Sequence, residues 1–179
     1  MIKNQIFFGE EIPFQNHWKN ITIEQINEVI PEKFLGKESF INFYTCYNGG
    51  DFTEYARFYP NESCDLPEDW TDHKDLKEMN VLGFYEIALP NEEKKSFSIQ
   101  EIAKSLYEHN ESGDSFKKFI TTHIPFANDL SSSIYLISVL SGEIKYLDFT
   151  EDFFNPENAV TVATSFSDFC KRIKKYNIG

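Results

Sequence analysis

The chain has 179 residues, and its 29 acidic against 17 basic residues give a formal net charge of -12 at pH 7. Such a charge repels phosphate backbones and anionic lipid headgroups, which argues against direct binding to nucleic acid or to a membrane. Hydrophobic residues make up 41% of the chain and aromatic residues 16%, so the acidity does not indicate disorder. For this length we expect one packed domain spanning residues 1–179.

The sequence predicts a cytoplasmic protein. No segment approaches the roughly 20 apolar residues of a membrane helix, and the first residues, MIKNQIFFGEEIPF, lack the apolar core and cleavage site of a signal peptide. Three widely spaced cysteines suit free thiols in a reducing compartment better than a disulfide framework. The three cysteines are Cys46, Cys64 and Cys170, and we expect Cys46 and Cys170 to be buried.

Two amphipathic helices are predicted near the start of the chain. The first spans residues 22–30, where isoleucine and valine recur at helical spacing, Thr22 is placed to cap the first turn and Pro31 ends the run. The second spans residues 38–47. It carries an aromatic stripe at i, i+3, i+4 and i+7 that we expect to face the core: Phe40, Phe43, Tyr44 and Tyr47.

The tripeptide Asn48-Gly49-Gly50 follows the second helix. A phosphate-binding loop has the opposite order, because its glycines follow a strand and precede a helix. We therefore expect Gly49 to take the left-handed C′ position that ends the helix, and Gly50 to lead into an extended segment. A hairpin turn is the remaining alternative.

An acidic excursion is predicted at about residues 53–80, after a short strand. Residues 51–80 hold nine acidic and three basic residues, so this segment carries a charge of -6, half of the formal total. Such a surface would speed encounter with a cationic protein, and Trp70 would suit an anchoring contact. We predict a partner-binding surface of six residues: Asp51, Glu54, Glu68, Asp69, Trp70 and Asp72. The alternatives are that the acids serve only solubility and that Trp70 pins its own loop.

The middle of the chain alternates strand and helix signals. Residues 81–89 predict a central strand that ends at Pro90. Ser98 and Glu101 then have the spacing of a capping box, which predicts the start of a third helix.

The last third of the chain predicts a hairpin and a closing helix. Residues 134–140 and 143–149 are β-prone and meet at Ser141-Gly142. The final segment, AVTVATSFSDFCKRIKKY, changes from strand-like to helical periodicity at Ser165. We expect its helix to bury Ile173 and to place basic residues as far as Lys175 near its negative C-terminal end.

The sequence predicts no enzymatic activity, no cofactor and no metal. None of the four histidines lies four residues from another histidine or at short spacing from a cysteine. They are His17, His73, His109 and His123. The acids after the hairpin lack the alternating pattern of a calcium loop, so we expect a solvated loop at Asp148, Glu151 and Asp152. A small hydrolase is the remaining enzymatic alternative.

Several segments resemble the SUKH superfamily. They are FYTCYNGGDF at 43–52, IPFAND at 124–129, IYLISVLSGEIKYLDF at 134–149 and ATSFSDFCKRI at 163–173. The resemblance covers about residues 22–52 and 119–173, and it implies an α+β fold in which a largely antiparallel mixed sheet is flanked by helices. The chain departs from the family at Ser131-Ser132-Ser133, where a turn containing glycine is expected, and in the acidic excursion.

The resemblance also implies a class of function. Many bacterial members are cytoplasmic immunity proteins that neutralise polymorphic toxins, often nucleases, and fungal members regulate cell-wall assembly as interaction scaffolds. No shared catalytic residues come with the resemblance. We therefore expect an immunity-type protein that binds a cationic toxin domain. The alternative is an intracellular regulatory scaffold that binds other cellular proteins.

Overall fold

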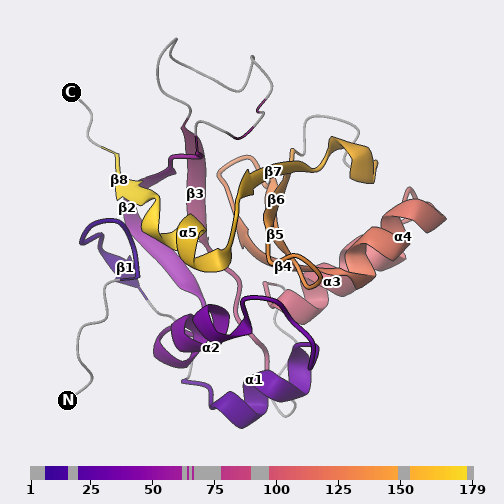
Figure 1. The fold of residues 1–179 in the computed structure, drawn as a ribbon, viewed down its shortest axis with the longest axis horizontal. Helices are drawn as coiled ribbons and strands as arrows, with labels where there is room; N and C mark the ends of the chain where they lie inside the picture. Colours follow the sequence, from indigo (N-terminus) through magenta and orange to yellow (C-terminus); the bar gives the residue numbers. More distant parts are fainter. Residues whose placement is uncertain are drawn as a thin grey trace.

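The computed structural model describes residues 7–15, 20–61, 64, 66, 78–89, 97–148 and 154–176. Over these residues the chain forms one α+β domain, in which five helices pack against an eight-stranded antiparallel sheet (Figure 1). The predicted fold class is therefore confirmed. In the described residues, none of the helices is long and apolar enough to cross a membrane.

The strands follow a simple order across the sheet, β1-β2-β3-β4-β5-β6-β7, with β8 paired to β2. Their bounds are β1 Phe14–Gln15, β2 Gly50–Phe58, β3 Met79–Phe84, β4 His123–Asn128, β5 Ile134–Ser138, β6 Ile144–Leu147, β7 Val160–Ala163 and β8 Ile173–Lys175. The helices are α1 Ile23–Val29, α2 Lys37–Cys46, α3 Ile99–Glu108, α4 Asp114–Thr121 and α5 Phe166–Lys171, with a short 3₁₀ turn, η2, at Pro156–Asn158.

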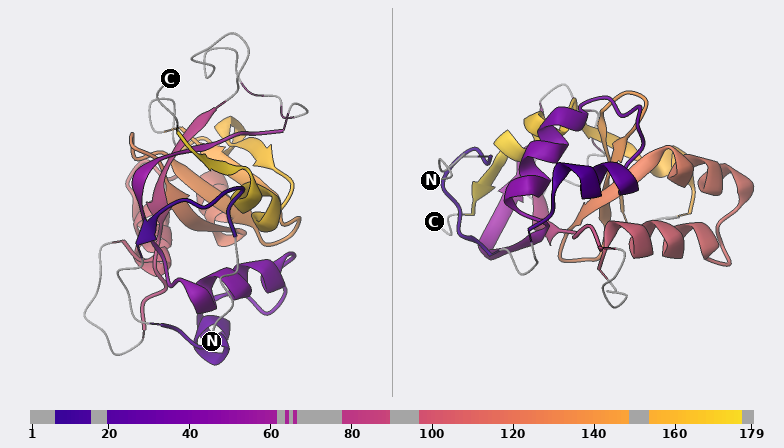
Figure 2. Two further views of the ribbon diagram at one scale, coloured as in Figure 1. Left: turned by 90° about the vertical axis from the view of Figure 1, so that its left-hand side faces the viewer. Right: turned by 90° about the horizontal axis from the view of Figure 1, so that it is seen from below.

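The helices lie on both faces of the sheet. In Figure 1 α5 lies in front of the sheet, and the view from below in Figure 2 places α3 and α4 on the opposite, back face. The front layer holds an aromatic core in which Phe43 lies 4.6 Å from Phe84, and Phe58 lies 4.6 Å from Phe169, between ring centroids. Burying these rings against α2 and α5 is the main stabilising feature of the front layer.

Local sequence signals start the helices as predicted. Thr22 and Gln25 form a reciprocal capping box at α1, with distances of 3.3 and 2.9 Å between the amide nitrogens and side-chain oxygens. Ser98 accepts a hydrogen bond from the Glu101 amide at 3.2 Å, and Ser165 caps α5 in the same way. The predicted stripe of α2 faces the core, because Phe40, Phe43 and Tyr44 are fully buried while Tyr47 is half-buried.

Gly49 is left-handed, as predicted, with φ of 79°. The C-cap of α2 is Tyr47, so Gly49 stands one position beyond the expected C′ residue. A Cβ atom at Gly49 would lie 2.8 Å from the backbone nitrogen of Glu86, so the glycine also permits a close backbone approach. Gly50 begins β2, which confirms the predicted extended segment.

The closing helix is shorter than predicted. The helix α5 ends at Lys171, and Ile173–Lys175 instead forms β8, which pairs with β2. Ile173 is buried as predicted, but opposite Phe58 on a strand. The unpaired edge of β2 offers this segment backbone partners, and this outweighs its weak helical periodicity.

Other elements were not predicted or differ in their bounds. The sequence analysis predicted neither the helix α4 nor the strand β4, although Phe116 and Ile120 of α4 have i, i+4 spacing. The predicted strand at 81–89 begins earlier and ends at Phe84. Because β2 extends to Phe58, the excursion lies between residues 59 and 78 rather than 53 and 80.

The three cysteines form no disulfide, as expected, but their burial differs from the prediction. Cys170 is buried on α5, whereas Cys46 and Cys64 are both partly exposed. Cys46 falls beside the aromatic stripe of α2 rather than within it, which explains why it is less buried than expected.

Candidate partner-binding site

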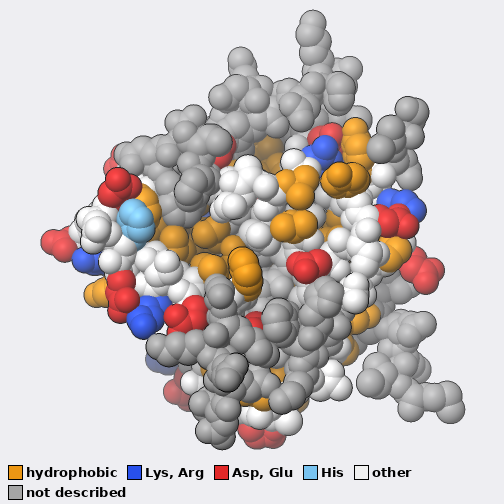
Figure 3. Space-filling view, turned by 180° about the vertical axis from the view of Figure 1, so that it is seen from behind, with side chains coloured by type: hydrophobic (Ala, Val, Ile, Leu, Met, Phe, Trp, Pro, Cys, Tyr) orange, Lys and Arg blue, Asp and Glu red, His pale blue; other side chains and the backbone are white. Residues whose placement is uncertain are grey.

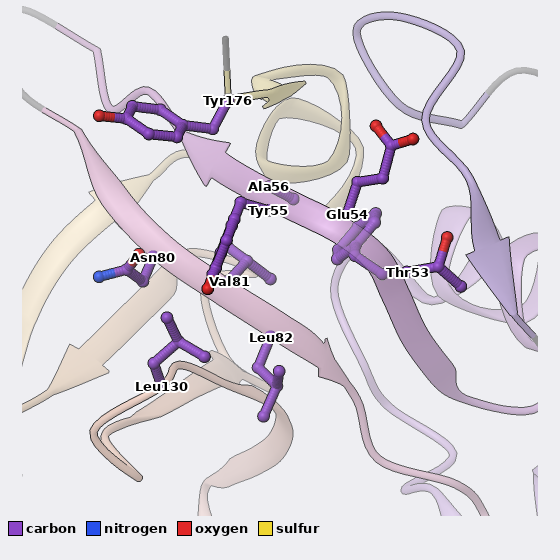
Figure 4. A pocket seen from close by; sticks show the side chains of 10 residues that line it. Thr53, Glu54, Tyr55, Ala56, Asn80, Val81, Leu82, Leu130 and Tyr176 are labelled. Atoms are coloured by element: carbon purple, nitrogen blue, oxygen red, sulfur yellow. The ribbon is translucent and has the colours of Figure 1, made fainter. Parts of the chain in front are cut away.

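An open groove crosses β2 and β3 on the back face of the sheet, opposite α5 (Figure 4). We call it the back-face groove; its volume is about 470 Å³. Figure 4 shows Tyr55, Leu82 and Leu130 projecting into it from β2, β3 and the turn after β4. A smaller hollow of about 190 Å³ adjoins it at Leu82 and is also lined by Asp51 and Phe97.

The groove collects exposed apolar side chains. Tyr55 is 63% exposed, Leu82 37% and Leu130 54%, while Phe97 in the adjoining hollow is 64% exposed. These are four of the eight large hydrophobic side chains that are exposed in the described residues. Figure 3 shows hydrophobic side chains reaching the surface on this back face. A single exposed apolar residue is ordinary, but a contiguous group of them marks an interaction surface.

An irregularity in β2 presents these side chains. Asp51 pairs with Gly83 and Ala56 pairs with Val81, so residues 52–55 of β2 stand opposite Leu82 alone. This bulge breaks the in–out alternation of the strand and leaves Thr53, Glu54 and Tyr55 exposed in succession. Bulges commonly re-aim side chains at functional sites.

The bulge is held from its outer side by the segments that flank it. The amide of Thr53 donates to the carbonyl oxygen of Pro13 at 3.1 Å. The amide of Tyr176 donates to the carbonyl oxygen of Tyr55 at 2.8 Å. These bonds satisfy backbone groups that the bulge would otherwise leave unpaired. The groove therefore rests on a fixed backbone.

Two carboxylates lie along the rim. Asp51 lines the smaller hollow, and Glu54 lines the main groove, where it forms an ion pair with Lys175 of β8. Both partners of this pair are 43% exposed, so solvent screens the pair and its contribution to stability is small. The pair shows that the position of Glu54 accepts an ammonium group.

Arg57 contacts two residues that line the groove, Tyr176 and Asn80. Its guanidinium lies 4.7 Å from the centroid of the Tyr176 ring, and its Nη1 donates to the Asn80 side chain. Its Nε is 3.8 Å from a carboxylate oxygen of Glu78. The cation is therefore used internally to hold Tyr176 at the groove wall.

The turn that carries Leu130 is organised by Asp129, which is 5% exposed. Its Oδ1 accepts hydrogen bonds from the amides of Ser131 at 2.8 Å and Ser133 at 2.9 Å. Ser132 has φ of 70°, in the left-handed region. The chain thus makes with serine the turn for which the SUKH pattern expects glycine, and the local hydrogen bonds of Asp129 offset the backbone strain.

Two of the six predicted partner-binding residues are described by the structure: Glu54 lines the groove and Asp51 lines the adjoining hollow. The other four lie outside the described residues: Glu68, Asp69, Trp70 and Asp72. The tripeptide Asn48-Gly49-Gly50 has a structural role, because Asn48 bonds the backbone of Ile87 through both its carboxamide oxygen and nitrogen.

Sequence analysis missed the apolar residues of the groove. The segment around Leu82 was predicted only as a central strand, and the bulge at Tyr55 has no sequence signature of its own. Exposure of Leu130 follows from the turn geometry set by Asp129. The sequence around Leu82 does not alternate, because Val81 and Leu82 are both apolar, and only the structure distinguishes buried Val81 from exposed Leu82.

The described residues contain no group of three or more His, Cys, Asp or Glu side chains placed to hold a metal ion. Burial lowers the pKa of His123, which stacks on Phe119 at 3.9 Å between ring centroids. Burial also raises the pKa of Cys170, so its thiol is a poor nucleophile. His109 stacks on Phe154 beside a separate cavity of about 310 Å³. His17, His73, Glu151 and Asp152 are outside the described residues.

Comparisons of the chain with models of known protein families, with curated proteins and with solved structures found no match.

Proposed function

We propose that this is an immunity-type protein that binds and neutralises a polymorphic toxin by protein–protein interaction. The observation that carries the proposal is the back-face groove, which is lined by exposed Tyr55, Leu82 and Leu130 together with Glu54, and which adjoins the hollow that Asp51 lines. Apolar anchors within a charged rim are the usual composition of a specific protein interface. The resemblance to the SUKH superfamily supports an immunity role.

The charge of the protein favours a basic partner. A formal net charge of -12 attracts a cationic protein over long range and speeds association. A nuclease must bind phosphates and so presents a cationic surface. In this proposal the protein covers that surface and blocks the substrate, which requires an equimolar complex and no catalysis.

The test is co-expression with the toxin domain encoded by the gene immediately upstream. We expect protection of the cells and an equimolar complex on size-exclusion chromatography. Protection by this protein at a large molar deficit would indicate catalysis instead. If no toxin gene adjoins the coding sequence, or a toxin domain found there neither binds nor is neutralised, the immunity role is wrong and a regulatory scaffold becomes the better hypothesis.

A further inference from the structure

Among the described residues, helices cover the back face of the sheet over only part of its width. The helices α3 and α4 lie against this face (Figure 2), and α3 begins directly after Phe97, at the edge of the smaller hollow. Over β2 and β3 the same face presents the back-face groove, with exposed Tyr55 and Leu82. A sheet face of this composition is normally buried against another element.

Strand addition at β2 is excluded by the pairing of the sheet. One edge of β2 is bonded to β3, and the other is bonded to β1 at Phe52 and to β8 at residues 56–58. Between β1 and β8, the backbone groups of Thr53 and Tyr55 are bonded to Pro13 and Tyr176. A bound segment therefore contacts the groove through its side chains, which is the mode of an amphipathic helix laid on an apolar groove.

Charge selects among possible occupants. A second copy of this chain would bring another formal charge of -12 to a surface that already carries Asp51 and Glu54. A segment with lysine or arginine beside its apolar stripe would instead pair with both carboxylates. Lys175 already places an ammonium on Glu54, so the rim accepts this group.

We infer that the back-face groove receives a basic amphipathic helix of the toxin, lying on β2 and β3 on the same face as α3. Its apolar side chains contact Tyr55, Leu82 and Leu130, and its basic side chains lie at Asp51 and Glu54. This inference rests on the proposed function for the identity of the partner. The chemistry of the groove can be tested without that partner.

The probe is a synthetic leucine–lysine peptide with helical periodicity, about 15 residues long because shorter isolated helices are marginal. Its binding to the full-length ¹⁵N-labelled protein is followed by NMR. We expect saturable shifts centred on residues 51–55, Leu82 and Leu130. A peptide with the same lysines and serine in place of leucine measures non-specific attraction to the acidic protein, and we expect it to bind at least about tenfold more weakly.

Leu82→Ser and Tyr55→Ser should each weaken binding of the leucine–lysine peptide at least about tenfold. The matched control is Leu140→Ser, which removes a leucine that is 75% exposed outside the groove, and its affinity should equal that of the wild type. Equal affinity of the two peptides, or shifts centred outside the groove, would overturn the inference.

The same variants separate the inference from the proposed function. If the toxin domain binds and is neutralised but Leu82→Ser and Tyr55→Ser leave its affinity unchanged, the groove assignment is wrong and the immunity role stands. If the leucine–lysine peptide binds the groove but no adjacent toxin is neutralised, the groove chemistry stands and the immunity role is wrong.

Discussion

The hydroxyl of Tyr146 on β6 donates a hydrogen bond of 2.6 Å to Oδ2 of Asp129, and both side chains are buried. The other oxygen of the same carboxylate binds the amides of Ser131 and Ser133. Tyr146 therefore fixes the residue that shapes the Leu130 turn. Burial raises the pKa of Tyr146 most, and the negative charge of Asp129 raises it further. The phenol therefore keeps its proton over the physiological range.

Removing this hydroxyl should destabilise the protein. Tyr146→Phe leaves one buried carboxylate oxygen with fewer donors, and a hydrogen bond to a charged group contributes about 1.5–3 kcal/mol. We expect a loss of that size in the free energy of unfolding, measured with urea. The control is Tyr107→Phe, which alters a tyrosine that is 44% exposed and should change stability little. Equal stability of the wild type and Tyr146→Phe would mean that the hydrogen bond is not formed.

Two left-handed glycines allow conformational strain to be separated from steric strain. Gly36 has φ of 84°, and a Cβ atom added there would meet nothing within 4 Å, so Gly36→Ala should cost only the roughly 1–2 kcal/mol of the left-handed region. Gly49→Ala adds a collision with the backbone of Glu86 and Phe84, and we expect a further cost of about 1–3 kcal/mol. Urea unfolding of both variants measures the difference. Equal costs would show that the backbone can move away from Gly49.

Local signals in the sequence predicted the starts of helices and the end of α2. Thr22, Ser98 and Ser165 are caps whose partners lie three residues away, so their role depends on neighbouring residues alone. Ile173 shows the limit of this approach, because its burial was predicted but its strand required the free edge of β2. The groove was harder still to predict, since it depends on the register shift of β2 against β3.

Stability should depend on pH through His123. Burial lowers its pKa below the ordinary 6.5, despite the hydrogen bond of 2.8 Å to the Phe119 carbonyl, and the nearby charge of Lys145 lowers it further. The unfolded chain therefore binds a proton more readily than the folded protein. The stability gained from neutral His123 is fully present above pH 6.5 and is lost as pH falls below that value.

The measurement is urea unfolding of the wild type and His123→Gln between about pH 5 and pH 8. We expect the wild type to lose stability relative to His123→Gln towards the acidic end. His109→Gln, which removes an exposed histidine, is the comparison for loss of an imidazole as such. Parallel pH profiles for the wild type and His123→Gln would contradict the assignment.

The ion pair between Lys175 and Glu54 should slow capture of a basic partner, because Lys175 competes for the carboxylate at the groove rim. Lys175→Gln frees Glu54 and makes the groove more negative, so association with the leucine–lysine peptide should become about twofold faster at low salt. Lys174→Gln is the matched control, since it causes the same change in net charge at the adjacent residue, whose ammonium lies over the Tyr59 ring at 5.6 Å.

Stopped-flow kinetics should show the faster association only for Lys175→Gln, and the gain should vanish near 1 M salt, where screening acts within about 3 Å. Unfolding should change by less than about 1 kcal/mol in both variants, because the pair is exposed. Equal acceleration by both substitutions would show that only the overall charge of the protein, and not the carboxylate at the groove, directs the encounter.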